Sequence, residues 1–378
     1  MSQQKLVVFG AVMAALAVLS APVFGECAVI EDAMGRNVEI PDRVERVICS
    51  GPGCLRLLTY LRAQDLAVAV DDMEKRRPEF DARPYALANP QFKKLPVFGE
   101  FRGHDHPELI LALSPMPQVI FKTHAHMGHD PVELQNKTGI PVVVLNYGDL
   151  GANREQLFQA LRIMGGTVDR EQRAEEVISF FTNHIEELAD RTGNIPDGEK
   201  PRCFVGGVAS KGPHGYQSTE PGYPPFAFVG AKNLAYDPSK GKKALRHANI
   251  AKEKIVEWDP DILFLDLSTI QLGNDAGGLY ELRTDPAYRS LSAVRAGRVY
   301  GLLPYNWYTR NFGSILANAW YVGKLLYPER FPDVDPAGKA DEIYTFLVGK
   351  PVFKEMNKAF HGLVFRPVLG KQAGDDAF

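Results

Sequence analysis

The feature that most constrains this chain is a short sequence pattern that occurs twice. The first copy runs from Glu108 to Pro115 and precedes an apolar run at 119–121; the second runs from Glu253 to Pro260 and precedes an apolar run at 263–265. In each copy a glutamate opens a short helix, a proline ends it, and the apolar run is typical of a buried parallel strand. The repetition predicts two similar α/β lobes.

The N-terminus has the pattern of an export signal. Lys5 precedes an apolar stretch over residues 6–24, and Phe24 and Gly25 end it in the manner of a signal-peptidase site. We predict a signal peptide over residues 1–25 and a periplasmic mature protein. Two alternatives stay open: the stretch approaches the length that spans a bilayer and could remain as a membrane anchor, and Cys27 could carry a lipid.

Size and charge narrow the class of protein. The mature chain is too long for one ordinary core and suits two lobes. Lysine and arginine number 43 against 46 aspartate and glutamate, and this net charge of −3 gives no reason to expect nucleic acid as a partner. The pairing of the cysteines cannot be decided from the sequence; they are Cys27, Cys49, Cys54 and Cys203.

The periodicity along the chain divides it into two lobes and a helical linker. Strands are predicted at 44–49, 66–70 and 142–145 in the first lobe and at 203–208 and 298–303 in the second, with a C-terminal helix at 314–326. Between the lobes we expect helices at 153–164 and 169–191, separated at Gly165 and Gly166. The second helix is long enough, at roughly 35 Å, to act as a stiff strut. The predicted boundaries are 26–152, 153–192 and 193–378.

The order of several motifs over residues 28–360 resembles the periplasmic binding proteins that serve ABC importers of iron-siderophores, haem and cobalamin. These motifs are residues 32–41, Arg46-Val-Ile, the two glutamate patterns, residues 297–300 and Tyr327-Pro-Glu-Arg-Phe331. The resemblance implies two α/β lobes joined by one long helix, a ligand held in the cleft between them, and only a small hinge motion. It also implies a monomer without an intrinsic cofactor that delivers a small-molecule metal chelate to an ABC permease dimer.

The same resemblance assigns a role to Glu108 and Glu253. They match the surface glutamates, one on each lobe, that contact arginines of the permease. Two exposed carboxylates set apart on one face can orient a binding protein through charge-assisted hydrogen bonds. The alternative is local, because a glutamate in a first helical turn stabilises any helix through the helix dipole. The duplication favours docking.

Ligands of open α/β sheets bind beyond the carboxyl ends of the strands, and this rule selects candidate loops in both lobes. These loops are rich in aromatic and cationic side chains, which suit a large planar or chelated anion through stacking and bidentate pairing. Packing of the loops is the alternative role for the tyrosines. The candidate ligand contacts are Arg76, Arg102, Lys122, Tyr216, Tyr223, Tyr305, Trp307, Tyr308 and Arg310.

Five of the nine histidines lie close together in the sequence, at positions 104, 106, 124, 126 and 129. Clustered imidazoles bind transition metals, so His104, His106, His124, His126 and His129 are candidate ligands of a metal or of a chelated metal with open coordination positions. Exposure to solvent is the alternative. The segment 123–129 also resembles the metal motif of metallo-β-lactamase-fold hydrolases, although Gly128 stands where that motif has an aspartate.

The sequence shows no nucleophile elbow and no phosphate-binding glycine loop. We therefore expect a binding protein rather than an enzyme. The predicted function is capture of a metal chelate, a ferric siderophore first of all, and its delivery to an ABC permease. Cobalamin, haem and a bare metal ion are alternatives because fold does not fix the ligand. A zinc-dependent hydrolase that uses His124, His126 and His129 is the distant one.

Overall fold

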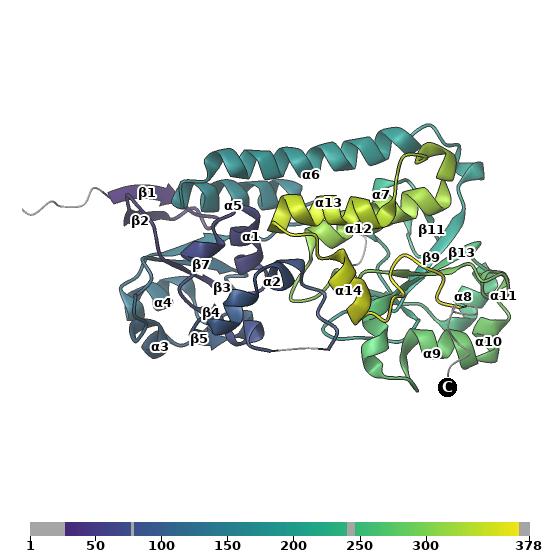
Figure 1. The fold of residues 1–378 in the computed structure, drawn as a ribbon, viewed down its shortest axis with the longest axis horizontal. Helices are drawn as coiled ribbons and strands as arrows, with labels where there is room; N and C mark the ends of the chain where they lie inside the picture. The colour runs from purple at the N-terminus through teal and green to yellow at the C-terminus, as the bar shows by residue number, and fades with distance from the viewer. Residues whose placement is uncertain (1–26, 77–78, 240–245, 370–378) are drawn as a thin grey trace, which may run out of the picture.

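Two parallel β-sheets form the centres of two lobes (Figure 1). The computed structural model describes residues 27–76, 79–239 and 246–369. In the first lobe, β7 (Val119–Thr123) lies between β3 (Val47–Ser50) and β8 (Val142–Leu145), and all three strands are parallel and buried. Continuous apolar runs form such strands because both faces of the sheet are covered.

The rest of the first lobe surrounds this sheet. A hairpin of β1 and β2 precedes it, and a second small sheet of β4, β5 and β6 lies beside it. The elements are β1 (Cys27–Glu31), β2 (Asn37–Pro41), α1 (Cys54–Tyr60), β4 (Val70–Asp71), α2 (Pro84–Ala88), β5 (Val97–Glu100), β6 (His104–Asp105), α3 (Pro107–Leu111) and α4 (Pro131–Thr138).

The second lobe has four parallel strands in the order β11, β9, β13, β14. Its strands are β9 (Arg202–Gly206), β10 (Ser218–Thr219), β11 (Lys232–Asn233), β12 (Ala248–Asn249), β13 (Ile262–Asp266) and β14 (Val299–Leu302). Its helices are α7 (Pro224–Phe228), α8 (Lys252–Trp258), α9 (Gly277–Thr284), α10 (Pro286–Arg289), α11 (Ser292–Arg295), α12 (Phe312–Leu326), α13 (Pro336–Val348) and α14 (Phe353–Ala359). Both glutamate patterns form the predicted helix and strand, as α3 with β7 and as α8 with β13.

A long helix, α6 (Glu171–Thr192), extends over both lobes (Figure 1). It packs on α5 (Arg154–Thr167) and also contacts α7 and α12 of the second lobe. Within this contact, the indole N–H of Trp320 donates to Nδ1 of the buried His184 at 3.0 Å. The predicted break at Gly165 and Gly166 is wrong: α5 continues through both glycines, and the chain turns at residues 168–170 instead.

These findings confirm the two-lobed α/β fold, while the exact lobe boundaries stay a prediction. The predicted signal peptide and its alternatives lie outside the described residues. No helix in the described ranges is long and apolar enough to span a membrane. Cys49, Cys54 and Cys203 are buried free thiols, so none of these three is paired in the structure.

Candidate functional site

Two adjoining cavities lie where loops of the two lobes meet. We call the first, of about 650 Å³, the polar cavity, because residues such as His126, Asn146 and Arg310 line it. The second, of about 690 Å³, is the aromatic cavity, lined by residues that include Phe101 and Trp307. The two share one wall, formed by His124, Ser210, Arg246, Asn306 and Thr309.

The position of both cavities follows from the sheets. Loops that follow β3, β7 and β8 contribute Pro52, His124 and Tyr147, and loops that follow β9, β13 and β14 contribute Ser210, Gln271 and Thr309. The carboxyl ends of parallel strands meet at one edge of a sheet, so each lobe presents its loops there. Loops at the carboxyl ends of the strands of both lobes therefore line the two cavities; that a ligand binds there stays a prediction.

The aromatic cavity combines cations with aromatic faces. The guanidinium of Arg76 lies 4.7 Å from the centre of the Phe101 ring, and that of Arg102 lies 5.1 Å from it. Arg76 also forms an exposed ion pair with Asp72 at 2.8 Å. In the described part of the chain, no carboxylate lies within ion-pair distance of Arg102. This side chain therefore presents an unpaired positive charge to the cavity.

The cations of the polar cavity are largely compensated by carboxylates. Arg310 pairs with Glu220 at 2.6 Å and lies 3.8 Å from Asp149, which is also 3.4 Å from Arg246. Burial raises the pKa of Glu220 although Arg310 and Tyr305 counteract this. Burial would raise the pKa of Asp149 too, but hydrogen bonds, chiefly from Asn153, hold it below its ordinary value. Arg310 thus anchors buried carboxylates as well as lining the cavity.

His124 is a neutral imidazole in the wall shared by both cavities. Burial, with His126 and Arg246 nearby, lowers the pKa of His124 to about 4. Its ring stacks on that of Tyr147, with 5.8 Å between ring centres. Its Nε2 is buried and has no hydrogen-bond partner among the described residues. A neutral imidazole nitrogen without a partner can act as a metal ligand or accept a hydrogen bond.

Five of the nine predicted ligand contacts line these cavities: Arg76, Arg102, Trp307 and Tyr308 the aromatic one, and Arg310 the polar one. The other four lie elsewhere. Lys122 is completely buried and pairs with Asp105 at 2.7 Å, so its charge is used inside the first lobe. Tyr216, Tyr223 and Tyr305 are at most 1% exposed and pack in the core. Their loops are at the predicted edge, but their rings point into the lobe.

The five clustered histidines are divided between two places. His124 and His126 line the polar cavity, whereas His104, His106 and His129 line a separate outer cavity of about 570 Å³ beside Glu108. The five therefore do not share one site. No group of three His, Cys, Asp or Glu side chains within the described ranges could hold a metal ion.

Sequence reasoning missed several residues of the shared wall. Asn306 lies between the predicted contacts Tyr305 and Trp307, and its side-chain amide donates to the carbonyl of Ala209 at 2.7 Å. Arg246, with a side chain that is 68% exposed, follows the undescribed residues 240–245 in a region without periodicity. The positive charge of Arg246 could have made it a candidate ligand contact, but nothing in the sequence placed it at the cavity.

A pair of parallel-sheet lobes with ligand-sized cavities between them defines a class of two-lobed binding proteins. The family model described as periplasmic binding protein matches residues 47–305. The chain therefore belongs to this family, as the resemblance implied.

Individual relatives are distant in sequence. The molybdate-binding protein MolA of Haemophilus influenzae is 22% identical over 339 residues, which cover 84% of this chain and 89% of MolA. The fold is similar to that of a periplasmic solute-binding protein of Veillonella parvula, with a TM-score of 0.67, 18% identity, and coverage of 90% of this chain and 98% of that one. It is also similar to the haem-binding protein HutB of Vibrio cholerae, with a TM-score of 0.52, 21% identity, and coverage of 75% and 99%.

Family membership settles several general properties. Periplasmic binding proteins act outside the cytoplasm, bind a transported ligand rather than an intrinsic cofactor, and work with the permease of an ABC transporter. They are substrate-binding proteins and not enzymes. The zinc-hydrolase interpretation of His124, His126 and His129 is therefore wrong.

Proposed function

We propose that this protein captures an anionic metal complex with an organic body, a ferric siderophore first of all, and delivers it to an ABC permease. Cobalamin and haem remain alternatives of the same kind, since each presents a metal within a large organic ligand. Arg76, Arg102, Trp307, Tyr308 and Arg310 are the proposed contacts.

The unpaired cations of the aromatic cavity carry this proposal. Arg102 and Lys211 both line it, no carboxylate of a described residue lies within ion-pair distance of either, and no Asp or Glu is among the lining residues. Trp307 and Phe101 add aromatic faces beside these charges. Stacking on rings together with pairing to cations suits an anion that has a planar organic part, such as a catecholate.

Size supports an organic ligand as well. Cavities of about 300–1,000 Å³ are typical of sites for drug-sized molecules, and each of the two cavities here, at about 650 and 690 Å³, falls in that range. A ligand that reached from one cavity to the other would pass His124 in the shared wall. Its unpartnered Nε2 suits an open coordination position of the bound metal.

A tetrahedral oxyanion is the second candidate. The relative MolA binds molybdate, and in this chain the polar cavity offers Arg246, Arg310 and Asn306 as donors. The compensation of both arginines by Asp149 and Glu220 counts against it, because a small anion bound there would compete with carboxylates that are already in place.

Protein purified from its own periplasm without added chelator should identify the ligand class. Native mass spectrometry, metal analysis and an absorbance spectrum should find a co-purified organic metal complex. In calorimetry, we expect the ferric complex of 2,3-dihydroxybenzoate to bind more tightly than molybdate. Arg102→Gln should weaken the ferric complex by about tenfold, whereas the exposed surface variant Arg43→Gln should not. Preferential binding of molybdate, with no effect of Arg102→Gln, would contradict the proposal.

We further propose that Glu108 and Glu253 contact the permease dimer and that the mature protein is a periplasmic monomer released from residues 1–25. Both glutamates are exposed in the first turns of α3 and α8. Glu108→Ala combined with Glu253→Ala should leave ligand binding intact and abolish transport in a reconstituted importer. The control exchanges Glu257, exposed at the other end of α8, for alanine. Loss of ligand binding in the double variant would argue against docking.

A further inference from the structure

The segment Trp307–Arg310 lines both cavities in a strained backbone conformation. Tyr308 has φ 47° and Thr309 has φ 61°, so two successive residues with side chains occupy the left-handed region. Residues with side chains rarely adopt this conformation and persist in it only where their surroundings hold them. The segment connects β14 to α12 in the second lobe. The side chain of Asn311 in its own lobe donates to the Trp307 carbonyl at 3.2 Å, and residues of the first lobe restrain it further.

Arg56, in α1 of the first lobe, reaches this segment with its guanidinium. Its Nη1 donates to the carbonyl oxygen of Arg310 at 2.8 Å, and its Nη2 donates to those of Trp307 and Tyr308, each at 3.2 Å. Nη1 also donates to the hydroxyl of Tyr147. Arg56 is only 1% exposed, and no carboxylate of the described residues forms an ion pair with it. Its donors are directed mainly at the backbone of the strained segment.

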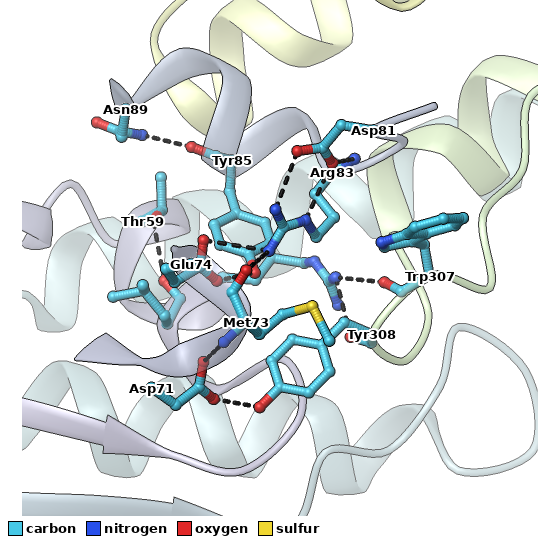
Figure 2. A network of polar contacts seen from close by, with 12 residues as sticks. Thr59, Asp71, Met73, Glu74, Asp81, Arg83, Tyr85, Asn89, Trp307 and Tyr308 are labelled. Atoms are coloured by element: carbon cyan, nitrogen blue, oxygen red, sulfur yellow. Dashed lines mark hydrogen bonds and ion pairs between the residues drawn. The ribbon is translucent and has the colours of Figure 1, made fainter. Parts of the chain in front are cut away.

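The side chain of Tyr308 is held from the same direction. Its hydroxyl donates to the buried carboxylate of Asp71, in the first lobe, as Figure 2 shows. The same hydroxyl accepts from the backbone N–H of Arg102 at 3.3 Å. The turn before α1 also packs closely against the segment, because a Cβ on Gly53 would come within 2.6 Å of the Thr309 methyl group. Backbone and side chain of the segment are thus both fixed by the opposite lobe.

Arg56 packs against Tyr85, which belongs to a buried polar network. The Tyr85 ring lies 5.1 Å from its guanidinium carbon. The Tyr85 hydroxyl donates to Glu74, which pairs with Arg83 at 3.2 Å, and Arg83 pairs in turn with Asp81 (Figure 2). We propose that Arg56 is a positioning residue that holds the segment Trp307–Arg310 of the second lobe in its ligand-binding conformation before any ligand arrives.

The geometry distinguishes this role from ordinary core packing. A buried guanidinium carries a large desolvation cost, which a hydrophobic side chain of similar size avoids. Stability alone would therefore not favour arginine here. What arginine adds is a planar fork of donors, and the three carbonyls to which it donates all belong to one strained segment of the cavity wall.

Hydrogen–deuterium exchange of the ligand-free protein tests this proposal without depending on the ligand. The reporter is the backbone N–H of Asn311, which donates to the Tyr305 carbonyl at 2.7 Å at the base of the segment. In Arg56→Met, peptides that cover residues 305–311 should exchange at least tenfold faster, while peptides of β7 and β13 should change less than twofold. The matched control is Tyr85→Phe, which removes the hydroxyl that donates to Glu74 but keeps the ring that lies against the Arg56 guanidinium and removes no contact to the segment. It should leave exchange at 305–311 unchanged.

Two outcomes would overturn the positioning role. One is unchanged exchange at 305–311 in Arg56→Met; the other is an equal acceleration at 305–311 and in the central strands, which would show general destabilisation. If Arg56→Met does not fold, Arg56→Lys decides, because it keeps the charge but lacks the planar fork. Exchange at 305–311 that matches the wild type in Arg56→Lys would show that charge alone suffices and would equally refute the proposal.

Discussion

Arg310→Ala should destabilise the fold before any effect on ligand binding can be interpreted. The Arg310 side chain is 13% exposed and that of its partner Glu220 is 4% exposed, with 2.6 Å between the charged atoms. Removing one partner of a buried ion pair typically costs about 3–5 kcal/mol, because the other charge stays buried without compensation. Glu220 keeps the hydrogen bond from the Tyr305 hydroxyl, and burial already raises its pKa, so it can take up a proton. We therefore expect the lower end, about 3 kcal/mol.

Urea unfolding followed by circular dichroism measures this loss. The double variant Arg310→Ala with Glu220→Gln should lie within about 1 kcal/mol of Glu220→Gln alone, which gives a coupling energy of about 2 kcal/mol. The control is Arg246→Ala, which lines the same cavity with a side chain that is 68% exposed and should change stability by less than about 0.5 kcal/mol. If Arg310→Ala were as stable as Arg246→Ala, the structural role assigned to Arg310 would be refuted.

Three further predictions concern the titratable side chains of Asp266, His184 and His124. Burial raises the pKa of Asp266 to about 7, so the folded state holds this proton more tightly than the unfolded chain does. The free energy of unfolding therefore falls as the pH rises from about 4 to about 7. Asp266→Asn should remove the contribution of Asp266 to that fall, about 2–4 kcal/mol, as measured by urea unfolding at pH 8. Burial lowers the pKa of His184 to about 4, so on acidification the unfolded chain is protonated at His184 before the folded state is. The free energy of unfolding therefore drops as the pH falls from about 6.5 to about 4. His184→Gln, which keeps an acceptor for Trp320, should remove about 3 kcal/mol of that drop, and an unchanged dependence of stability on pH would contradict this. If His124 completes the coordination of a bound metal, His124→Ala should abolish the shift of the visible absorption band that binding of a ferric complex produces; an identical shift would place His124 outside the coordination sphere.

The fold was largely predictable because its signals are local. The helix dipole favours the glutamates at the start of α3 and of α8. Burial of both faces of the sheet favours the apolar runs of β7 and β13. The error at Gly165 and Gly166 has a physical cause. Glycine costs only about 1 kcal/mol inside a helix, and in α5 a Cβ at Gly165 would lie 3.0 Å from the Ala174 side chain. Close packing on α6 thus favours glycine there without ending the helix.

The candidate site was predictable only as a set of loops. Trp307 and Tyr305 belong to the same short segment and have similar composition around them, yet Trp307 lines a cavity and Tyr305 is completely buried. The difference arises from Glu220, which is distant in the sequence and accepts a hydrogen bond from the Tyr305 hydroxyl. Lys122, in β7 of the central sheet, is likewise paired with Asp105, in β6 of the small sheet. A sequence shows which side chains a loop carries, but the partner that draws a side chain inward comes from tertiary structure.

The distribution of charge between the two cavities has a consequence for how a ligand would be oriented. Arg310 and Arg246 of the polar cavity already face Asp149 and Glu220, so an anion there gains little net attraction. Arg102 and Lys211 of the aromatic cavity have no such partners among the described residues. The anionic and aromatic part of a ligand is therefore favoured beside Phe101 and Trp307. Charge thus favours one orientation of a ligand that spans both cavities.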